Sequence, residues 1–333
     1  MREEYGGCLH FEIPQAVGGY YDRYKYHMVN VDSGRSALQY ILENFNYKRI
    51  WLPVYNCPLV EQRISEISNI EVCWYNIQSN FLPDIDMHEF NNGDCLLWVN
   101  YCGVMSQSVI ATILALQKET PVKIIFDNIP AYFSQPQMEA INIYSCRKFI
   151  GVPDGGHVIG NDIKTRKLPT YSTAANYVYL MRAIETGSNS AYEGYSESEK
   201  RFRQSNVAYG MPELTKVILG GVDYNSLITK RKKNFLALHE ILGERNRLLL
   251  DISTNTPSVY PYLCSDTKLR EHLLENKIYI SRFWKHVLSN ELANGFEKDL
   301  AEYLIPLPID QRYDVDDMKY IAMKVLKLED VSK

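Results

Sequence analysis

The stretch that decides the fold lies between positions 122 and 156. It reads VKIIFD at 122–127, AINIYSCRK at 140–148 and GVPDGG at 151–156. Two short apolar runs, at 122–127 and 140–144, are typical of buried strands. The first run ends in Asp127, and Lys148 follows the second run after a short turn. In α/β folds the ends of such strands open onto ligand crevices, so these two charged side chains are candidates for a shared site.

A carboxylate at the end of one strand and a lysine just past the next suit pyridoxal phosphate. The lysine amine forms a Schiff base with the cofactor, and the aspartate keeps the pyridine nitrogen protonated so that the ring withdraws electrons. An acid at a strand end is common, and one lysine among 36 Lys and Arg residues is usually a solvated surface charge. The order of Asp127 and Lys148, with Asp154-Gly155-Gly156 behind them, favours the cofactor site over that ordinary explanation.

The sequence around this stretch predicts an α/β fold with a mainly parallel, mixed sheet flanked by helices. Apolar runs alternate with helical patterns, which is typical of a sheet covered on both faces. The predicted strands are 49–53, 71–75, 95–100, 122–127, 140–144 and 157–160, and the predicted helices between them are 36–45, 58–67 and 106–118. We predict an N-terminal arm at 1–29, a large domain at 30–225 and a smaller C-terminal α+β domain at 226–333.

The second half of the chain shows a less regular pattern. A helix is predicted near 174–185, and a long helical pattern runs from 213 to about 242. The polar segment 187–199 is expected to be a mobile loop or an interface element. In the smaller domain, strands are predicted at 258–263, 278–282 and 304–307, and helices at 268–276 and 315–328.

The composition argues against several classes of function. With 36 basic and 40 acidic residues the net charge is −4, and no basic run resembles a nucleic-acid-binding surface. No apolar stretch approaches the roughly 20 residues that span a bilayer, and the acidic N-terminus lacks the apolar region of a signal peptide. The seven cysteines include no Cys-x-x-Cys pair, which indicates neither a zinc site nor a disulfide framework. We therefore expect a cytoplasmic protein without a metal, a membrane or a nucleic acid as partner.

Two further segments could contact a ligand. The turn Ser33-Gly34-Arg35-Ser36 precedes a predicted helix, whose free N–H groups and dipole would attract a phosphate. An ordinary helix cap explains the same residues. The segment Tyr55-Asn56-Cys57-Pro58 lies between a strand and a helix, where it would either face the ligand crevice or form a simple turn.

The order of these motifs resembles the DegT/DnrJ/StrS family, the sugar aminotransferase branch of the fold type I enzymes that depend on pyridoxal phosphate. Ser33-Gly34-Arg35-Ser36-Ala37-Leu38 is similar to its Ser-Gly-Thr-x-Ala-Leu phosphate turn, and Ile125-Phe126-Asp127 to the strand with its pyridine-binding aspartate. Lys148, followed by Asp154-Gly155-Gly156, matches its cofactor lysine. Residues 277–282 and 304–308 resemble two strands of its small domain, so the resemblance covers roughly residues 30 to 328.

The resemblance implies a role for individual residues. Lys148 would hold the cofactor covalently and then act as general acid and base, while Asp127 would pair with the pyridine nitrogen. The phosphate would be held by a group of cofactor-binding residues, namely Ser33, Gly34, Arg35 and Ser145. Cys57 lies where the family often has an aromatic residue that stacks on the ring. Arg282 would bind a substrate carboxylate or form a surface ion pair.

The sequence departs from the family pattern at three positions. Pro130 stands where the family usually has Gln or His beside a cofactor oxygen, and Asn100 or Tyr101 is a candidate to replace it. Cys57 replaces the stacking aromatic residue, for which Tyr55 could compensate. Ala208 stands at the family asparagine that reaches the phosphate of a neighbouring subunit, and Asn206 is close by.

The resemblance implies an aminotransferase. It would move an amino group from an amino acid such as glutamate to a keto or aldehyde acceptor, for example a nucleotide-linked keto-sugar, and would act as a homodimer. Two alternatives stay open: a lyase or decarboxylase with the same cofactor, and a non-catalytic binding or regulatory protein that keeps the fold.

Overall fold

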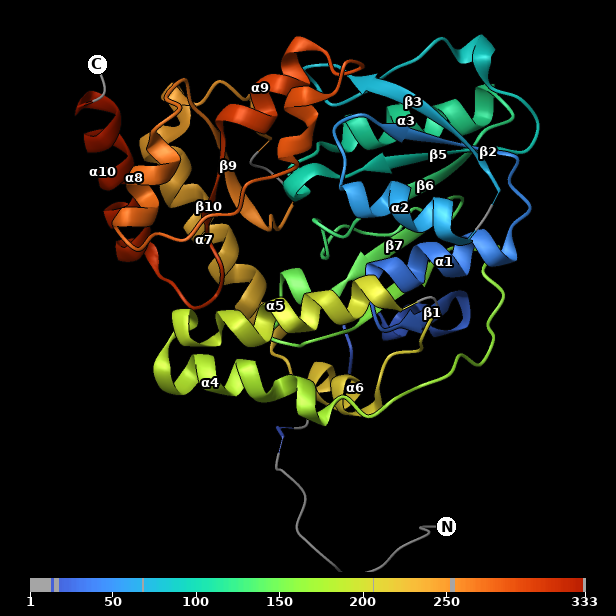
Figure 1. Cartoon of the computed structure of the whole chain (residues 1–333), viewed down its shortest axis with the longest axis horizontal. Helices are drawn as coiled ribbons and strands as arrows, with labels where there is room; N and C mark the ends of the chain where they lie inside the picture. The colour runs from blue at the N-terminus through green and yellow to red at the C-terminus, as the bar shows by residue number, and fades with distance from the viewer. Residues whose placement is uncertain (1–12, 15–17, 68, 206, 252–254, 332–333) are drawn as a thin grey trace, which may run out of the picture.

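The computed structural model describes residues 13–14, 18–67, 69–205, 207–251 and 255–331. Its main feature is a mixed eight-stranded sheet with the strand order β1-β8-β7-β6-β5-β2-β3-β4 (Figure 1). The strands are β1 (Met28–Val31), β2 (Arg49–Pro53), β3 (Glu71–Ile77), β4 (Pro83–Asp84), β5 (Asp94–Val99), β6 (Lys123–Asp127), β7 (Ile141–Ser145) and β8 (Gly156–Ile159). The five strands from β7 to β3 in this order are parallel, whereas β8 runs antiparallel to both β1 and β7. The predicted fold class is therefore confirmed.

Helices cover the sheet and account for its burial. All residues of β5 and β7 are buried, which requires side chains to pack on both faces. The helices of this part are α1 (Gly34–Asn44), α2 (Pro58–Ile67) and α3 (Gln107–Glu119). Helix α1 packs against β7 and β8 and lies beside α2, while α3 packs on β6. The hydroxyl groups of Ser33 and Ser106 cap α1 and α3 by accepting a backbone N–H bond.

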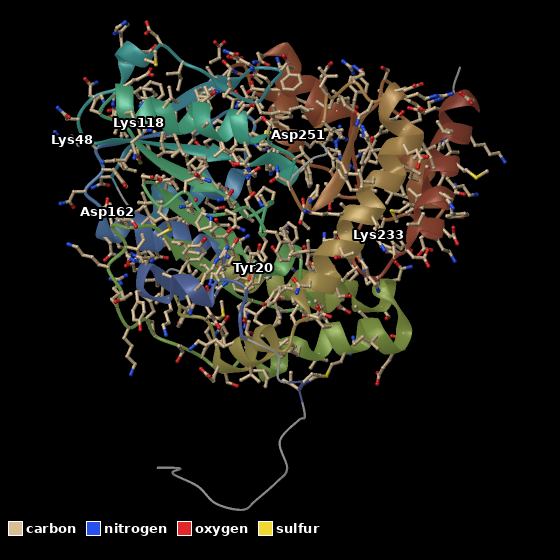
Figure 2. The ribbon with its side chains drawn as sticks, turned by 180° about the vertical axis from the view of Figure 1, so that it is seen from behind. Tyr20, Lys48, Lys118, Asp162, Lys233 and Asp251 are labelled. Atoms are coloured by element: carbon tan, nitrogen blue, oxygen red, sulfur yellow. The ribbon has the colours of Figure 1, made fainter. Side chains whose placement is uncertain are left out.

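The C-terminal part is built around an antiparallel pair of strands, β9 (Val259–Leu263) and β10 (Leu304–Pro308). Its helices are α7 (Tyr224–Leu242), α8 (Leu269–Glu275), α9 (Gly295–Tyr303) and α10 (Val315–Val331). The predicted domain boundaries stay predictions, and residues 1–12 and 15–17 of the predicted arm lie outside the described residues. Viewed from behind, Lys48 and Lys118 lie on one side of the molecule and Lys233 of α7 on the other (Figure 2).

Two expected elements of the second half were wrong, and one helix was missed. The predicted helix 213–242 is split into α6 (Glu213–Gly220) and α7, because the Asp223 side chain accepts from Ser226 N at 2.9 Å and starts a new helix. The predicted strand 278–282 has no regular structure, and left-handed backbone at Lys277 (φ 61°) and Trp284 (φ 47°) flanks it. Helix α9 was missed, although Asn294 and Glu297 form a capping box at its start.

The polar segment 187–199 is helical from Ser188 onward, so the expectation of a mobile loop was wrong, whereas the alternative of an interface element stays a prediction. It belongs to α5 (Ser188–Gln204), which forms an antiparallel hairpin with α4 (Val178–Thr186) beside α1 (Figure 1). Gly187 joins the two helices with a φ of 87°, a conformation that suits glycine. The helices approach closely at Gly194, where a Cβ atom would lie 2.7 Å from the Tyr179 Cβ.

The remaining helices are short 3₁₀ segments that connect the larger elements. They are η1 (Asp22–His27), η2 (Met87–Glu89), η3 (Tyr101–Gly103), η4 (Cys146–Lys148), η5 (Ala174–Tyr177), η6 (Gly243–Arg245) and η7 (Lys285–Ser289). Among the described residues, no helix has the length and apolar character that a membrane-spanning segment needs.

Candidate active site

Asp127 and Lys148 follow two neighbouring parallel strands. Asp127 is the last residue of β6 and lies opposite Ile143 of β7, and Lys148 ends the 3₁₀ turn η4 that follows β7. Because the carboxyl ends of parallel strands share one edge of a sheet, both side chains belong to the same edge. Both charges act on the pKa of the Cys57 thiol, which lies between β2 and α2. The structure therefore brings Asp127, Lys148 and Cys57 into one region.

The Asp127 carboxyl group is buried, with 5% of its surface exposed. Burial raises its pKa from 3.8 to about 7, against which one hydrogen bond from the Ile129 N–H (2.9 Å) acts weakly. In the part of the chain that the structure describes, no lysine or arginine forms an ion pair with it. A buried acid of this kind becomes a stable carboxylate when a cationic ligand group binds beside it.

Part of the Lys148 residue is exposed to solvent, but protein atoms crowd around its amine and remove much of the water there. This desolvation, followed by the repulsion from Arg147, lowers the pKa of the Lys148 amine, while Glu199 acts in the opposite direction. A lowered pKa increases the fraction of neutral amine at neutral pH, and the neutral amine is the nucleophile. Lys148 is thus suited to attack an aldehyde.

The N-terminus of α1 lies next to the end of β7. Ser145 pairs with Gly156 of β8, and a Cβ at Gly156 would lie 2.5 Å from the Tyr144 carbonyl oxygen and 3.4 Å from the Ser33 carbonyl carbon. Glycine at position 156 therefore permits the close approach of Ser33 to this strand end. The Ser33 hydroxyl accepts from Ser36 N at 3.2 Å, which fixes the first turn of the helix.

Cations are gathered around this helix end. Arg35 in the first turn of α1 lies 3.7 Å from the Glu199 carboxylate (Nη2 to Oε2), and Arg147 forms a closer ion pair with the same carboxylate. The N–H groups of a helix start and two guanidinium groups together form a site for an anion. Neither Arg147 nor Glu199 was predicted from the sequence. The position of Arg147 beside Lys148 was a usable signal, whereas nothing in the local sequence connects Glu199 to this site.

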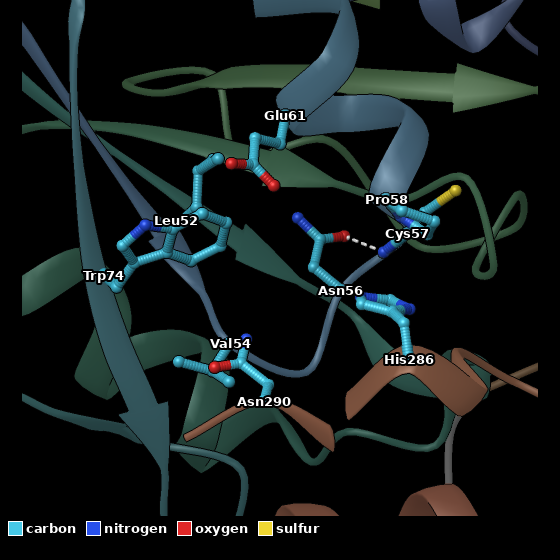
Figure 3. Close-up of a pocket in the computed structure, with 9 residues that line it drawn as sticks. All are labelled: Leu52, Val54, Asn56, Cys57, Pro58, Glu61, Trp74, His286 and Asn290. Atoms are coloured by element: carbon cyan, nitrogen blue, oxygen red, sulfur yellow. Dashed lines mark hydrogen bonds between the residues drawn. The ribbon is translucent and has the colours of Figure 1, made fainter. Parts of the chain in front are cut away.

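Cys57 borders a small hollow that is open to solvent (Figure 3). It lies between β2, β3, α2 and η7, and its lining consists of Leu52, Val54, Asn56, Cys57, Pro58, Glu61, Trp74, His286 and Asn290. The Asn56 side chain is buried, its Oδ1 accepts from Cys57 N at 2.7 Å, and its Nδ2 has no partner among the described residues. Sequence reasoning placed Asn56 and Cys57 at the crevice but missed Glu61 and His286.

Asn100, Tyr101 and Tyr55 were the candidates to replace the family residues that are absent at Pro130 and Cys57. In the structure their side chains contact other protein groups. The Tyr101 hydroxyl donates to the Tyr55 carbonyl at 2.8 Å, and the Asn100 amide donates to Asn128 and Ser134, both at 2.9 Å. The Tyr55 ring packs edge-on against Trp284, with 4.6 Å between centroids. None of these contacts tests the suggested roles, which stay predictions.

The other sequence candidates have clear positions. Arg282 forms an ion pair with Glu302 of α9, which matches the surface-pair interpretation, and its role toward a substrate stays a prediction. Pro130 is half-buried, and its carbonyl oxygen lies against Gly103. Ala208 is buried, and Asn206 lies outside the described residues.

Comparisons with known proteins place this arrangement in context. No model of a protein family matches the chain, and no curated protein matches it in sequence. Among solved structures, DesV from S. venezuelae, in complex with a ketimine intermediate, is similar at 15% identity with a TM-score of 0.63, over 91% of this chain and 84% of that one. PseC from Helicobacter pylori, an aminotransferase involved in the biosynthesis of pseudoaminic acid, is similar at 17% identity with a TM-score of 0.62, over 90% and 86%.

A third similar structure is the PLP form of Spr1654 from Streptococcus pneumoniae, a proposed sugar aminotransferase. It shares 14% identity and a TM-score of 0.62, over 91% of this chain and 88% of that one. At such identities the comparison establishes the fold. The chain therefore has the fold of the DegT/DnrJ/StrS type of sugar aminotransferases, as its sequence predicted.

Proposed function

We propose that this chain is an aminotransferase that depends on pyridoxal phosphate. The observation that carries the proposal is the pair of Asp127 and Lys148 at one sheet edge, with pKa values shifted toward each other. A raised pKa on a buried acid and a lowered pKa on a lysine are typical of functional sites. The names of the structural neighbours, which include DesV with a ketimine intermediate and Spr1654 in a PLP form, support the same chemistry.

The residues present fit this cofactor in three respects. Asp127 is a buried acid with a single backbone donor, which a protonated pyridine nitrogen would complement. Lys148 has the lowered pKa that an amine needs to react with an aldehyde. Arg35 and Arg147, at the start of α1, provide positive charge for a phosphate.

Bound pyridoxal phosphate supplies an aldehyde for the lysine amine and a ring that withdraws electrons from the α carbon of the amino donor. Asp127 would hold a proton on the ring nitrogen and thereby maintain that electron withdrawal. Lys148 Nζ would bind the aldehyde and, once the amino donor has displaced it, would carry the proton from the donor α carbon to C4′ of the cofactor. In the second half-reaction it would carry a proton in the opposite direction. Ser33, Gly34, Arg35 and Ser145 would orient the phosphate, and Cys57 would lie beside the ring.

The finer parts of the proposal concern substrates and assembly. We take glutamate as the amino donor and a nucleotide-linked keto-sugar as the acceptor. The neighbour PseC, named for its part in pseudoaminic acid biosynthesis, supports an acceptor of the sugar class. A homodimer in the cytoplasm is part of the same proposal.

The test uses the purified full chain incubated with pyridoxal phosphate. We expect a visible absorbance band that borohydride abolishes, with the reduced cofactor attached to the peptide that contains Lys148. The Lys148→Ala variant should show neither, while its fold by circular dichroism stays that of the wild type. Addition of glutamate should convert the band to that of the aminated cofactor.

Two results would favour the alternatives. A chain that stays colourless with the cofactor supports a non-catalytic binding protein. A chain that forms the adduct at Lys148 but releases carbon dioxide or a β-substituent from amino acids, without aminating the cofactor, supports a decarboxylase or lyase.

A further inference from the structure

The α4–α5 hairpin places one of its own carboxylates in the cationic part of the candidate site. Glu199 of α5 forms an ion pair with Arg147 and lies 3.7 Å from Arg35. Although burial acts to raise it, the pKa of Glu199 is lowered, chiefly by Arg147 and then by Lys148 and Arg35. Glu199 is therefore a carboxylate held by two guanidinium groups at the start of α1.

Further contacts attach α5 to the same place. Phe202, one turn after Glu199, is buried beneath the Arg147 guanidinium, with 4.6 Å between the guanidinium carbon and the ring centroid. At the end of the helix, Arg63 of α2 donates to the carbonyl groups of Phe202 and Ser205. The position of Glu199 is thus set by the packing of the helix together with its own ion pairs.

The charges favour an exchange of anions at this position. One carboxylate faces the guanidinium groups of Arg35 and Arg147, and a phosphate dianion would bring about twice its charge to the same place. The Arg147 Nε is buried and has no partner among the described residues, so this guanidinium can still donate to an additional acceptor. A carboxylate and a phosphate cannot occupy the same guanidinium groups at full strength together.

We infer that Glu199 is an internal counter-ion of the anion site, and that a phosphate monoester displaces it when it binds. The α4–α5 hairpin then acts as a lid, which is docked in the free protein and released from Arg35 and Arg147 in the bound one. The identification of that phosphate with the cofactor rests on the proposed function. A phosphate carried by the substrate would use the same chemistry.

The experiment compares the full chain with E199Q and with a matched control, E197Q. Glutamine keeps the size of the side chain and removes its charge. Glu197 lies on the same helix, is exposed, and forms no ion pair with Arg35 or Arg147 in the described structure. Binding of inorganic phosphate, pyridoxal phosphate and pyridoxal is measured by calorimetry, and amide hydrogen exchange of residues 188–204 is followed with and without phosphate.

We expect E199Q to bind inorganic phosphate about tenfold more tightly than the wild type, since the internal competitor is weakened. E197Q should equal the wild type. Exchange in α5 should increase when phosphate binds to the wild type, and it should already be increased in free E199Q. Equal phosphate affinity in all three proteins, no phosphate binding to any of them, or exchange in α5 that phosphate leaves unchanged would overturn the inference.

The three ligands separate this inference from the proposed function. Tighter binding of pyridoxal phosphate but not of pyridoxal by E199Q assigns the displaced position to the cofactor phosphate. Tighter binding of inorganic phosphate alone assigns it to a substrate phosphate. A Lys148 adduct that forms equally well in the wild type and E199Q, with unchanged phosphate affinity, leaves the aminotransferase proposal standing and removes the lid.

Discussion

Two buried acids near the same sheet edge have opposite surroundings. The Asp154 carboxylate, fully buried after β7, accepts hydrogen bonds from the hydroxyl groups of Thr173 and Thr215, and from Tyr171 at 3.4 Å. Asp127 at the end of β6 accepts one backbone hydrogen bond. Both carboxyl groups are buried, but side-chain hydroxyl groups donate hydrogen bonds to Asp154, whereas Asp127 receives a single backbone donor.

The number of hydrogen-bond donors distinguishes an acid with a structural role, Asp154, from an acid that can still bind a cationic group, Asp127. The Tyr171 hydroxyl lies between Asp154 and Asp32, which in turn accepts from Ser33 at 2.9 Å and Ser36 at 2.6 Å. This network holds the first turn of α1 and is complete without a ligand. Asp127 lacks such donors, so its charge is costly until a cation binds beside it. Hydrogen-bond saturation thus distinguishes the two roles more clearly than burial does.

The largest expected effect comes from Asp127→Asn. The amide keeps the size of the side chain and can still accept from Ile129 N, but it cannot hold a proton on the pyridine nitrogen. We expect kcat/KM for transamination to fall on the order of 1000-fold, with the fold and the Lys148 adduct retained. Steady-state rates measure the effect, and a variant with wild-type rates would show that Asp127 plays no part in the chemistry.

Asp154→Ala should cost stability. It removes the shared acceptor of buried hydroxyl donors, so we expect a loss of about 3 kcal/mol in the free energy of unfolding, measured by urea titration. Asp154→Asn, which keeps one acceptor oxygen, is the control and should lose less. If Asp154→Ala is as stable as the wild type, the network around Asp154 has no structural role, and the comparison with Asp127 fails.

The pH dependence of stability should follow Asp127. Its pKa is about 7 in the folded chain against 3.8 for the unperturbed group, so between these values the folded state holds a proton that the unfolded state has lost. The contribution of Asp127 to the stability of the ligand-free wild type should therefore fall as pH rises from 4 to 7. Asp127→Asn should be more stable than the wild type by about 2–4 kcal/mol at pH 8, and by nearly nothing at pH 4. A difference between the two proteins that is the same at both pH values would contradict the assignment.

Gly34→Ala should have the smallest effect. An added Cβ would lie 2.3 Å from Ile129 Cδ1, and this flexible side-chain end can move at a cost of about 1 kcal/mol. Because Ile129 N donates to Asp127, the shift should also change the Asp127 pKa, which NMR titration can detect. Gly220→Ala, where no atom lies within 4 Å of the added Cβ, is the control and should leave that pKa unchanged.

The sequence was informative where a structural element carries its own signal. The strands around Asp127 and Lys148 are short apolar runs bounded by polar residues, and the start of α1 has a Ser-Gly turn, so all three were predicted within a residue or two. Helix α5 lacked such a signal. Its buried residues include Ala191, Ser198 and Phe202, which lie at helical spacing, but the segment as a whole is so polar that it was interpreted as a loop or an interface element.

The sequence by itself determined which residues end the strands of the large sheet, because apolar alternation and turn residues act over a few neighbouring positions. It therefore predicted Asp127, Lys148 and the α1 turn as one candidate site. Only the tertiary structure decided which acid is saturated with donors and which is not, and that Glu199 meets Arg35 and Arg147. The ion pairs of Glu199 and the hydrogen bond from Thr215 to Asp154 join segments more than 50 positions apart, which no local pattern records.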